Sequence, residues 1–315
     1  MDMTSPLRFG TDGVRGPAVQ FDDAWVAALG EAAARVLGAD ATSMVIARDT
    51  RESGAGIEAA LAAGIARAGL HAVSLGVAPT PCAAWVAAER TVPAAVISAS
   101  HNPWHDNGIK FFAVGGRKLS DDVERALEAE IDRVVAQRGA EPVLPIIPDD
   151  ASDAVQQWCD AIVALGGESH DGSRIVVDCA NGAASVVGPT VLARLGIECE
   201  VLSAAPDGRN INAACGSTHP DDLRRRVVES GAALGLAFDG DADRLLAVDE
   251  TGELVDGDQL LAMFAHDLRA RGALAHDTVV VTVMTNLGFR LAMHDAGITV
   301  VDTPVGDRHV LAALE

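Results

Sequence analysis

The sequence has no apolar run that approaches the roughly 20 residues needed to cross a membrane as a helix. Its first residues, MDMTSPLRFG, contain no apolar stretch as long as that of a secretory signal peptide. These absences argue against a membrane-embedded protein and against export. We therefore expect a cytoplasmic protein without a membrane partner.

Positive charge is also scarce. The chain has 24 Lys and Arg residues against 45 Asp and Glu, a formal net charge of −21, and its two lysines, Lys110 and Lys118, lie in one short stretch. A nucleic-acid-binding protein needs a basic face to displace counterions from phosphates. Nucleic acid is therefore not an expected partner, and solubility is the simplest interpretation of the negative charge.

The cysteines show no paired spacing. None is part of a C-x-x-C motif, and an odd number leaves at least one unpaired. We expect reduced thiols that pack like small apolar side chains and do not bind metal or take part in catalysis. The five are Cys82, Cys159, Cys179, Cys199 and Cys215.

The first part of the chain alternates short β-branched runs with longer Ala-rich amphipathic stretches. This alternation is typical of βαβ units around a parallel, doubly wound sheet. It predicts strands at 44–47, 72–75 and 94–98 and a helix at 56–69. The strand at 94–98 runs directly into ASHNPWHDNG, and ligands of open α/β sheets gather beyond the carboxyl ends of strands.

Domain boundaries follow from breaks in this pattern. A helical pattern over 121–137 is followed by EPVLPIIPDD, whose prolines forbid regular structure and indicate a linker near residue 150. Two further βαβ series begin near Arg174 and Asp256. The last has too little chain for a unit of equal size, so we expect it to be incomplete. The expected domains are 1–150, 151–253 and 254–315.

The segment DGDADR, residues 239–244, follows an apolar strand-like run. Its carboxylates alternate with small residues, so several hard oxygens can turn toward one divalent cation, and oxygen ligands favour magnesium over zinc. A calcium-binding helix–loop–helix has the same Asp spacing, with Glu250 at its twelfth position, but Arg244 stands where glycine is needed. Calcium and a solvated acidic turn are the alternatives to magnesium. The candidate ligands are Asp239, Asp241 and Asp243.

A second segment, SASHNPWHDNGIKFF at 98–112, places Ser100 at a strand terminus. A serine there, followed by His101 and Lys110, can act as a nucleophile or carry a phosphate. The alternative is ordinary loop chemistry, since Ser and Asn also hydrogen-bond their own backbone. Neither an Asp-positioned His nor a G-x-S-x-G elbow is evident, which disfavours a hydrolase triad.

A third segment, FGTDGVRG at 9–16, combines paired glycines with an arginine. Glycines expose backbone N–H groups, and Arg15 supplies a bidentate fork, so the segment suits a cluster of anionic oxygens. An ordinary turn is the alternative.

In this order and at these separations, FGTDGVRG, ISASHNPWHDNGIKFF and FDGDADRLLAVDE resemble the α-D-phosphohexomutase superfamily. GRNINAACGSTHP (208–220) and TPVGDRHV (303–310) resemble its phosphoglucosamine mutase branch, because phosphomannomutases and phosphoglucomutases usually differ at both places. The resemblance covers nearly the whole chain. It implies successive three-layer α/β/α domains with mixed, mostly parallel sheets, and weakly favours a homodimer.

The resemblance also implies a chemistry. Ser100 matches a phosphoserine whose phosphate joins the three aspartates as a ligand of Mg²⁺. The implied reaction interconverts glucosamine 6-phosphate and glucosamine 1-phosphate through a bisphosphate, on the route to UDP-N-acetylglucosamine. The positions matching the surroundings of the phosphoryl group are Arg15, His101, Lys110 and Arg244. Asp307 and Arg308, in TPVGDRHV, are further candidates for binding phosphate or substrate.

The sequence departs from the family pattern in one respect. The family's third domain continues to a sugar-binding loop of the G-E-x-S-G type, and its fourth domain carries an R-x-S-G-T-E-P-like phosphate-binding loop. Neither occurs here, so we expect a C-terminally truncated chain without a fourth domain, incomplete for turnover because substrate orientation is missing. The competing interpretations are a phosphomannomutase or phosphoglucomutase, and a non-catalytic phosphosugar-binding fragment.

Overall fold

The computed structural model describes residues 7, 9–10, 13–139, 141–166 and 172–314. The chain divides into two compact units, residues 1–252 and 253–315. Within the described residues, the first unit contains an eight-stranded sheet and four strands of a five-stranded sheet, and the second contains a two-stranded sheet. No helix of these described ranges combines the length and the apolarity that crossing a bilayer requires.

The eight-stranded sheet is mixed, with the order β1-β2-β6-β5-β3-β4-β8 and β7 paired to β6. Strand β3 is parallel to β4 and β5, and β4 to β8, whereas β6 is antiparallel to β2 and β5. The predicted strands at 44–47, 72–75 and 94–98 are β3, β4 and β5 in this parallel centre. The bounds are β1 Phe9–Gly10, β2 Gly13–Pro17, β3 Ser43–Arg48, β4 His71–Val77, β5 Ala94–Ile97, β6 Asp106–Ala113, β7 Arg117–Lys118 and β8 Asp149–Asp150.

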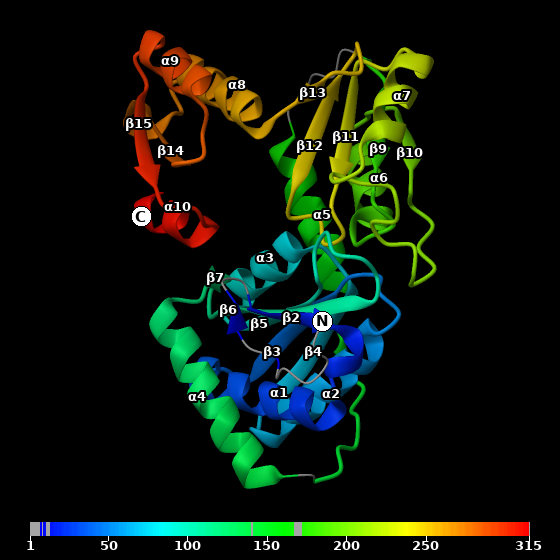
Figure 1. Ribbon diagram of the computed structural model, residues 1–315, viewed down its shortest axis with the longest axis vertical. Coiled ribbons are helices and arrows are strands. Elements are labelled where there is room, and N and C mark those ends of the chain that lie inside the picture. Colours follow the sequence, from blue (N-terminus) through cyan, green and yellow to red (C-terminus); the bar gives the residue numbers. More distant parts are fainter. Residues whose placement is uncertain (1–6, 8, 11–12, 140, 167–171, 315) are drawn as a thin grey trace. The chain divides into compact units, whose positions relative to one another are not determined.

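Strand β3 is buried on both faces, which explains its unbroken apolar run. Met44 and Ile46 pack into one core cluster and Val45 and Ala47 into another, because side chains alternate across a sheet. Figure 1 shows α1, α2 and α4 together on one side of this sheet, where they supply the first cluster. Helices α3 and α5 supply the second. The bounds are α1 Asp23–Leu37, α2 Gly54–Arg67, α3 Thr80–Arg90, α4 Asp121–Arg138 and α5 Asp153–Leu165, with a 3₁₀ turn η1 at Ala18–Gln20.

Helices α1 and α2 approach closely because glycines lie between them. A Cβ added to Gly64 would lie 1.9 Å from the carbonyl oxygen of Ala27, and one added to Gly30 would lie 2.4 Å from that of Leu61. The obstacle is backbone in both cases, so a neighbouring side chain cannot simply rotate away. We therefore expect Gly64→Ala to lower the free energy of unfolding by about 3 kcal/mol through overpacking. Urea denaturation measures this loss.

Gly56 offers a matched control on the same helix. A Cβ there meets nothing within 4 Å. Gly56→Ala is expected to raise the free energy of unfolding by up to about 1 kcal/mol, because alanine is the better helix former. If the two variants lost stability equally, close backbone packing could not be the reason.

The five-stranded sheet has the order β10-β9-β11-β12-β13. Strand β9 is parallel to β10 and β11, and β12 returns antiparallel to β11. Leu223 and Val227 of α7 pack on one face with Val176, and Ala184 of α6 packs on the other with Val177. The bounds are β9 Ile175–Asp178, α6 Ala184–Arg194, β10 Cys199–Leu202, α7 Asp221–Ser230, β11 Leu234–Phe238, β12 Leu245–Asp249 and β13 Leu254–Val255.

The second unit is a βαβ arrangement in which β14 is parallel to β15. Asp256 caps its first helix, since its side chain accepts from the amide of Gln259 while the Gln259 side chain accepts from the amide of Asp256. Phe289 and Met293 pack against Val281 in its core. The bounds are α8 Gly257–Ala270, η2 Ala275–Asp277, β14 Thr278–Thr282, α9 Leu287–Asp295, β15 Thr299–Thr303 and α10 Asp307–Leu314. The α/β class expected from the sequence is confirmed.

The five cysteines are all free thiols, as predicted, and four of them are buried. Cys82 lies on α3 and packs into the core cluster that this helix forms with the sheet, where burial raises its pKa to about 12. A thiol that stays protonated is a poor nucleophile and a poor metal ligand. Cys82 therefore packs as a small apolar side chain.

Candidate functional site

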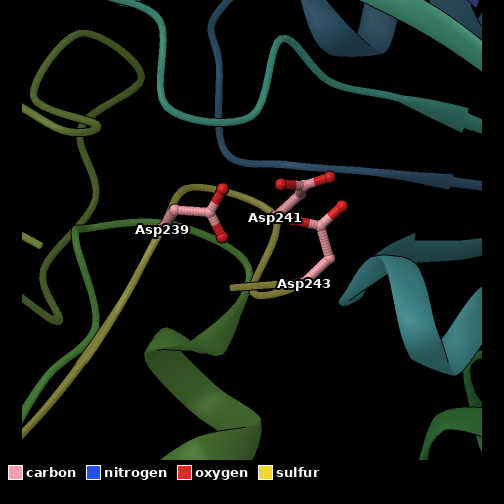
Figure 2. A group of neighbouring side chains, drawn as sticks. All are labelled: Asp239, Asp241 and Asp243. Atoms are coloured by element: carbon pink, nitrogen blue, oxygen red, sulfur yellow. The ribbon is translucent and has the colours of Figure 1, made fainter. Parts of the chain in front are cut away.

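The three predicted aspartates lie on one loop that follows β11. Asp239, Asp241 and Asp243 each offer a carboxylate oxygen, and these oxygens all lie within 4.8 Å of one another. Figure 2 shows the three carboxylates gathered around one region of the loop. One oxygen of Asp241, Oδ1, is buried without a hydrogen-bond partner among the described residues. A buried carboxylate oxygen without a donor fits a ligand of a hard cation.

Steric limits explain why Gly240 and Ala242 of this loop are small. A Cβ on Gly240 would lie 2.5 Å from the carbonyl oxygen of Ser100. Ala242 has a φ of 55°, in the left-handed region, where larger side chains are strained. The acidic loop and the serine loop therefore touch through their backbones.

Ser100 lies just beyond the end of β5 and is buried. Its hydroxyl donates to Asp239 Oδ2 at 2.6 Å, although the two residues are 139 positions apart. Its backbone N–H donates to Ser98 Oγ at 2.9 Å, and its φ is 53°. The structure thus brings the serine loop of the first sheet and the acidic loop of the second sheet into one site.

Lys110 comes from β6 and is buried against the acidic loop. Its Nζ forms ion pairs with Asp241 and, at 3.0 Å, with Asp243. Thr80, at the start of α3, adds a hydrogen bond of 2.6 Å to Asp241 Oδ2. The pairing of Lys110 balances part of the acidic charge, and the pair of Lys110 and Asp241 is buried.

The pKa values of Asp239 and Asp241 are shifted in opposite directions. Burial raises the pKa of Asp239, the charge of Asp241 raises it further, and the hydrogen bond from Ser100 only partly opposes them. Burial also favours a high pKa for Asp241, but the charge of Lys110 and the hydrogen bonds from Lys110 and Thr80 outweigh it, so the pKa of Asp241 lies below its ordinary value. A cation bound between neighbouring carboxylates reduces the repulsion between their charges.

Arg244 lies directly after the acidic loop and reaches the serine. Its Nε is 3.1 Å from Asp239 Oδ2, and its Nη2 donates to Ser100 Oγ and to His101 Nδ1. Burial and the charge of Arg244 lower the pKa of His101, which favours the neutral imidazole that accepts this bond. The Ser100 hydroxyl is therefore contacted by both a carboxylate and a guanidinium.

Arg15 lies on β2, next to the strand that carries Lys110. It pairs in register with Gly108, two residues before Lys110, and its charge contributes to lowering the pKa values of both Asp241 and His101. Thr11 and Asp12 of the same motif lie outside the described residues. The structure thus groups Arg15 with Ser100, His101, Lys110, Arg244 and the three aspartates.

Asp307 and Arg308 begin α10 in the second unit, residues 253–315. There the Asp307 side chain accepts from the backbone N–H of Arg308 at 2.8 Å. Their proposed part in substrate binding stays a prediction.

Several residues that contact the site were not singled out from the sequence. They include Asp49, Arg51, Thr80 and Asn212. One signal was available, because the segment DTRES (49–53) follows β3, the strand beside β5, and so lies at the same sheet edge as Ser100. The contacts of Thr80 and Asn212 depend on the meeting of distant segments, which the sequence does not display.

Comparison with family models gives matches along most of the chain. The models describe the α/β/α domains I, II and III of phosphoglucomutase/phosphomannomutase, and they match residues 6–138, 153–252 and 256–315. A phosphoglucosamine mutase of Pelotomaculum thermopropionicum is 49% identical over 317 residues, which cover 98% of this chain and 70% of the relative. Another, of Desulforudis audaxviator, is 50% identical over 96% of this chain and 68% of the relative.

Solved structures show the same likeness. A phosphoglucomutase/phosphomannomutase family protein from Burkholderia thailandensis has a TM-score of 0.85 at 26% identity, covering 99% of this chain and 69% of the other. An N-acetylphosphoglucosamine mutase of Aspergillus fumigatus, solved in complex with GlcNAc-6P and magnesium, has a TM-score of 0.60 at 18% identity, covering 99% and 65%. The second likeness concerns the fold alone.

Proposed function

The chain belongs to the phosphoglucomutase/phosphomannomutase family, most similar to its phosphoglucosamine mutases, and we propose that it interconverts glucosamine 6-phosphate and glucosamine 1-phosphate. Such an enzyme is an isomerase that moves a phosphoryl group within a sugar phosphate. The observation that carries the proposal is the hydrogen bond of 2.6 Å between Ser100 Oγ and Asp239 Oδ2. It joins the hydroxyl that would carry phosphate to the loop that would bind metal.

The donor set fits magnesium. Three carboxylates converge, one of their buried oxygens has no donor in the described part of the chain, and the candidate ligands are all oxygens. We propose that Asp239, Asp241, Asp243 and the phosphate on Ser100 hold Mg²⁺. The bound cation would supply positive charge between the acidic loop and a phosphoserine of roughly −1.5 to −2.

The residues of the chain then perform distinct tasks. The phosphoryl group passes from Ser100 Oγ to the free hydroxyl of the sugar, which loses a proton while Ser100 Oγ takes one up. The bisphosphate that forms turns round and returns its other phosphoryl group to Ser100 Oγ, which gives its proton to the oxygen left on the sugar. Arg244 and Arg15 bind phosphoryl oxygens, for which a guanidinium fork is suited. Lys110 is our candidate for the group that holds the phosphoryl oxygens or exchanges a proton with the sugar hydroxyl, and His101 orients Arg244 through the contact at Nδ1.

The setting follows from the same proposal. The substrate is a soluble hexosamine phosphate, so we propose a cytoplasmic enzyme that needs neither a membrane nor nucleic acid. The formal net charge of −21 supports the exclusion of nucleic acid. We also propose a homodimer, which analytical ultracentrifugation measures directly.

Substrate competition tests the proposed specificity. We expect kcat/KM for glucosamine 6-phosphate to exceed that for glucose 6-phosphate and mannose 6-phosphate by about tenfold or more, because an amino group offers a polar contact that a hydroxyl does not reproduce. A preference for mannose or glucose phosphate would favour the other mutases of the family. Binding of sugar phosphate without turnover or labelling of Ser100 would favour a non-catalytic protein.

A further inference from the structure

Arg51 is a buried arginine behind the loop that carries Ser100. Its Nε donates to Asp49 Oδ2 at 2.8 Å, while Nη1 and Nη2 donate to four main-chain carbonyls of one loop. Those carbonyls belong to Ser100, Asn102, Pro103 and Asp106. A guanidinium has five N–H donors, and all five are used here.

Asn212 holds the same loop from the second sheet's side. Its Nδ2 donates to the carbonyl of Ser100 at 2.9 Å and to that of Asn102 at 3.1 Å. Both carbonyls therefore accept from Arg51 and from Asn212. A segment 112 residues further along the chain completes the support of the serine loop.

The backbone N–H of Ser100 is linked by hydrogen bonds to the ion pair of Asp49 and Arg51. The Ser100 N–H donates to Ser98 Oγ, and the Ser98 hydroxyl donates to Asp49 Oδ2 at 2.6 Å. Ser100 itself has a φ of 53°, a conformation that persists only where the surroundings fix it. Its peptide groups are thus held on both sides by a network centred on Asp49 and Arg51.

We propose that Arg51 and Asn212 are positioning residues for phosphoryl transfer, and that they act by holding the loop carbonyls and thereby the direction of Ser100 Oγ. This inference rests on the proposed function. A protein catalyses phosphoryl transfer chiefly by positioning the reacting groups and by stabilising their charge. A displacement of about 1 Å in a reacting group can cost on the order of 100-fold in rate.

The number of N–H donors at position 51 suggests a variant that tests the proposal. Arg51→Lys keeps the positive charge beside Asp49, but an ammonium has three N–H donors for five acceptors. At least two of the five acceptors lose their hydrogen bond from residue 51. Asn212→Ala removes both of its carbonyl contacts without touching the charged pair.

The experiment measures kcat and KM for glucosamine 6-phosphate on a chain extended to the length of its relatives, of which this sequence covers about 70%. We expect Arg51→Lys and Asn212→Ala to lower kcat by about 10- to 100-fold and to leave KM nearly unchanged, the pattern of an interaction that acts in the transition state. Arg48→Lys is the matched control, because Arg48 ends β3 and pairs with Glu58 at 3.0 Å, a pair separate from the Arg51 carbonyl network. It should retain kcat.

Hydrogen exchange supplies a second readout. We expect the amides of residues 100–108 to exchange faster in Arg51→Lys and Asn212→Ala than in the wild type and in Arg48→Lys. Folded variants with wild-type kcat would overturn the proposal, and if Arg51→Lys does not fold, Asn212→Ala decides alone.

Failure of the proposed function looks different, because the wild type and Arg48→Lys would then also lack turnover. In that case exchange decides whether the loop is held as we propose. Faster exchange in Arg51→Lys and Asn212→Ala supports the proposed role, and unchanged exchange overturns it.

Discussion

Ser100→Ala is expected to abolish phosphoryl transfer and to leave the fold intact. The Ser100 hydroxyl would accept and donate the phosphoryl group. Among the described contacts, it is the hydroxyl that hydrogen-bonds to both Asp239 and Arg244. The substitution keeps the Cβ and removes only the hydroxyl of a residue whose φ is 53°, so it adds no steric conflict to the loop. The lost hydrogen bond costs about 1 kcal/mol of stability.

Two measurements check this result. Turnover of glucosamine 6-phosphate should fall below detection, and incubation with a hexose 1,6-bisphosphate should no longer add the roughly 80 Da of a phosphoryl group seen by intact-mass spectrometry. Ser74→Ala is the matched control, because the Ser74 hydroxyl also donates to a carboxylate, that of Glu58, but away from the site. Retained turnover in Ser100→Ala would remove the central role of this serine.

The place of each loop at the end of a strand could be anticipated from the sequence for a physical reason, whereas the meeting of the serine and acidic loops was implied only by the family resemblance. Ser100 follows the buried strand β5 and Asp239 follows β11, and side chains that follow such strands reach the carboxyl edge of their sheet. The types of the side chains then indicate oxygen ligation and phosphate chemistry. Elements were predicted to within a few residues, as for 56–69, which is α2 at Gly54–Arg67, because apolar periodicity defines the body of a helix better than its ends.

The support of the site could not be anticipated in the same way. Arg51 binds main-chain carbonyls, and every residue has a carbonyl, so no pattern of side chains marks its acceptors. Thr80 and Asn212 lie 161 and 112 positions from their partners. Such contacts exist only once both sheets have formed and their loops have met.

Replacing Asp239, Asp241 and Asp243 together with asparagine is expected to remove magnesium binding and turnover. A single Asp241→Asn should weaken the affinity, but asparagine still offers a carbonyl oxygen, so the triple change is the stricter test. It also leaves Lys110, which is 3% exposed, without its two carboxylate partners. Loss of a buried ion-pair partner typically costs about 3–5 kcal/mol, so we expect a lower midpoint of thermal unfolding as well.

The matched control removes the same number of carboxylates from exposed helix positions, as Glu89→Gln, Glu128→Gln and Asp132→Asn. Net charge then changes equally in both variants, so any difference in magnesium affinity by calorimetry belongs to the site. The phosphorylation state of Ser100 should matter too, because a phosphoserine adds oxygens and roughly −1.5 to −2 of charge beside the three carboxylates. We expect the phosphorylated wild type to bind magnesium more tightly than Ser100→Ala. Equal affinities would mean that the acidic loop binds the cation without the serine, and the two loops would then act separately.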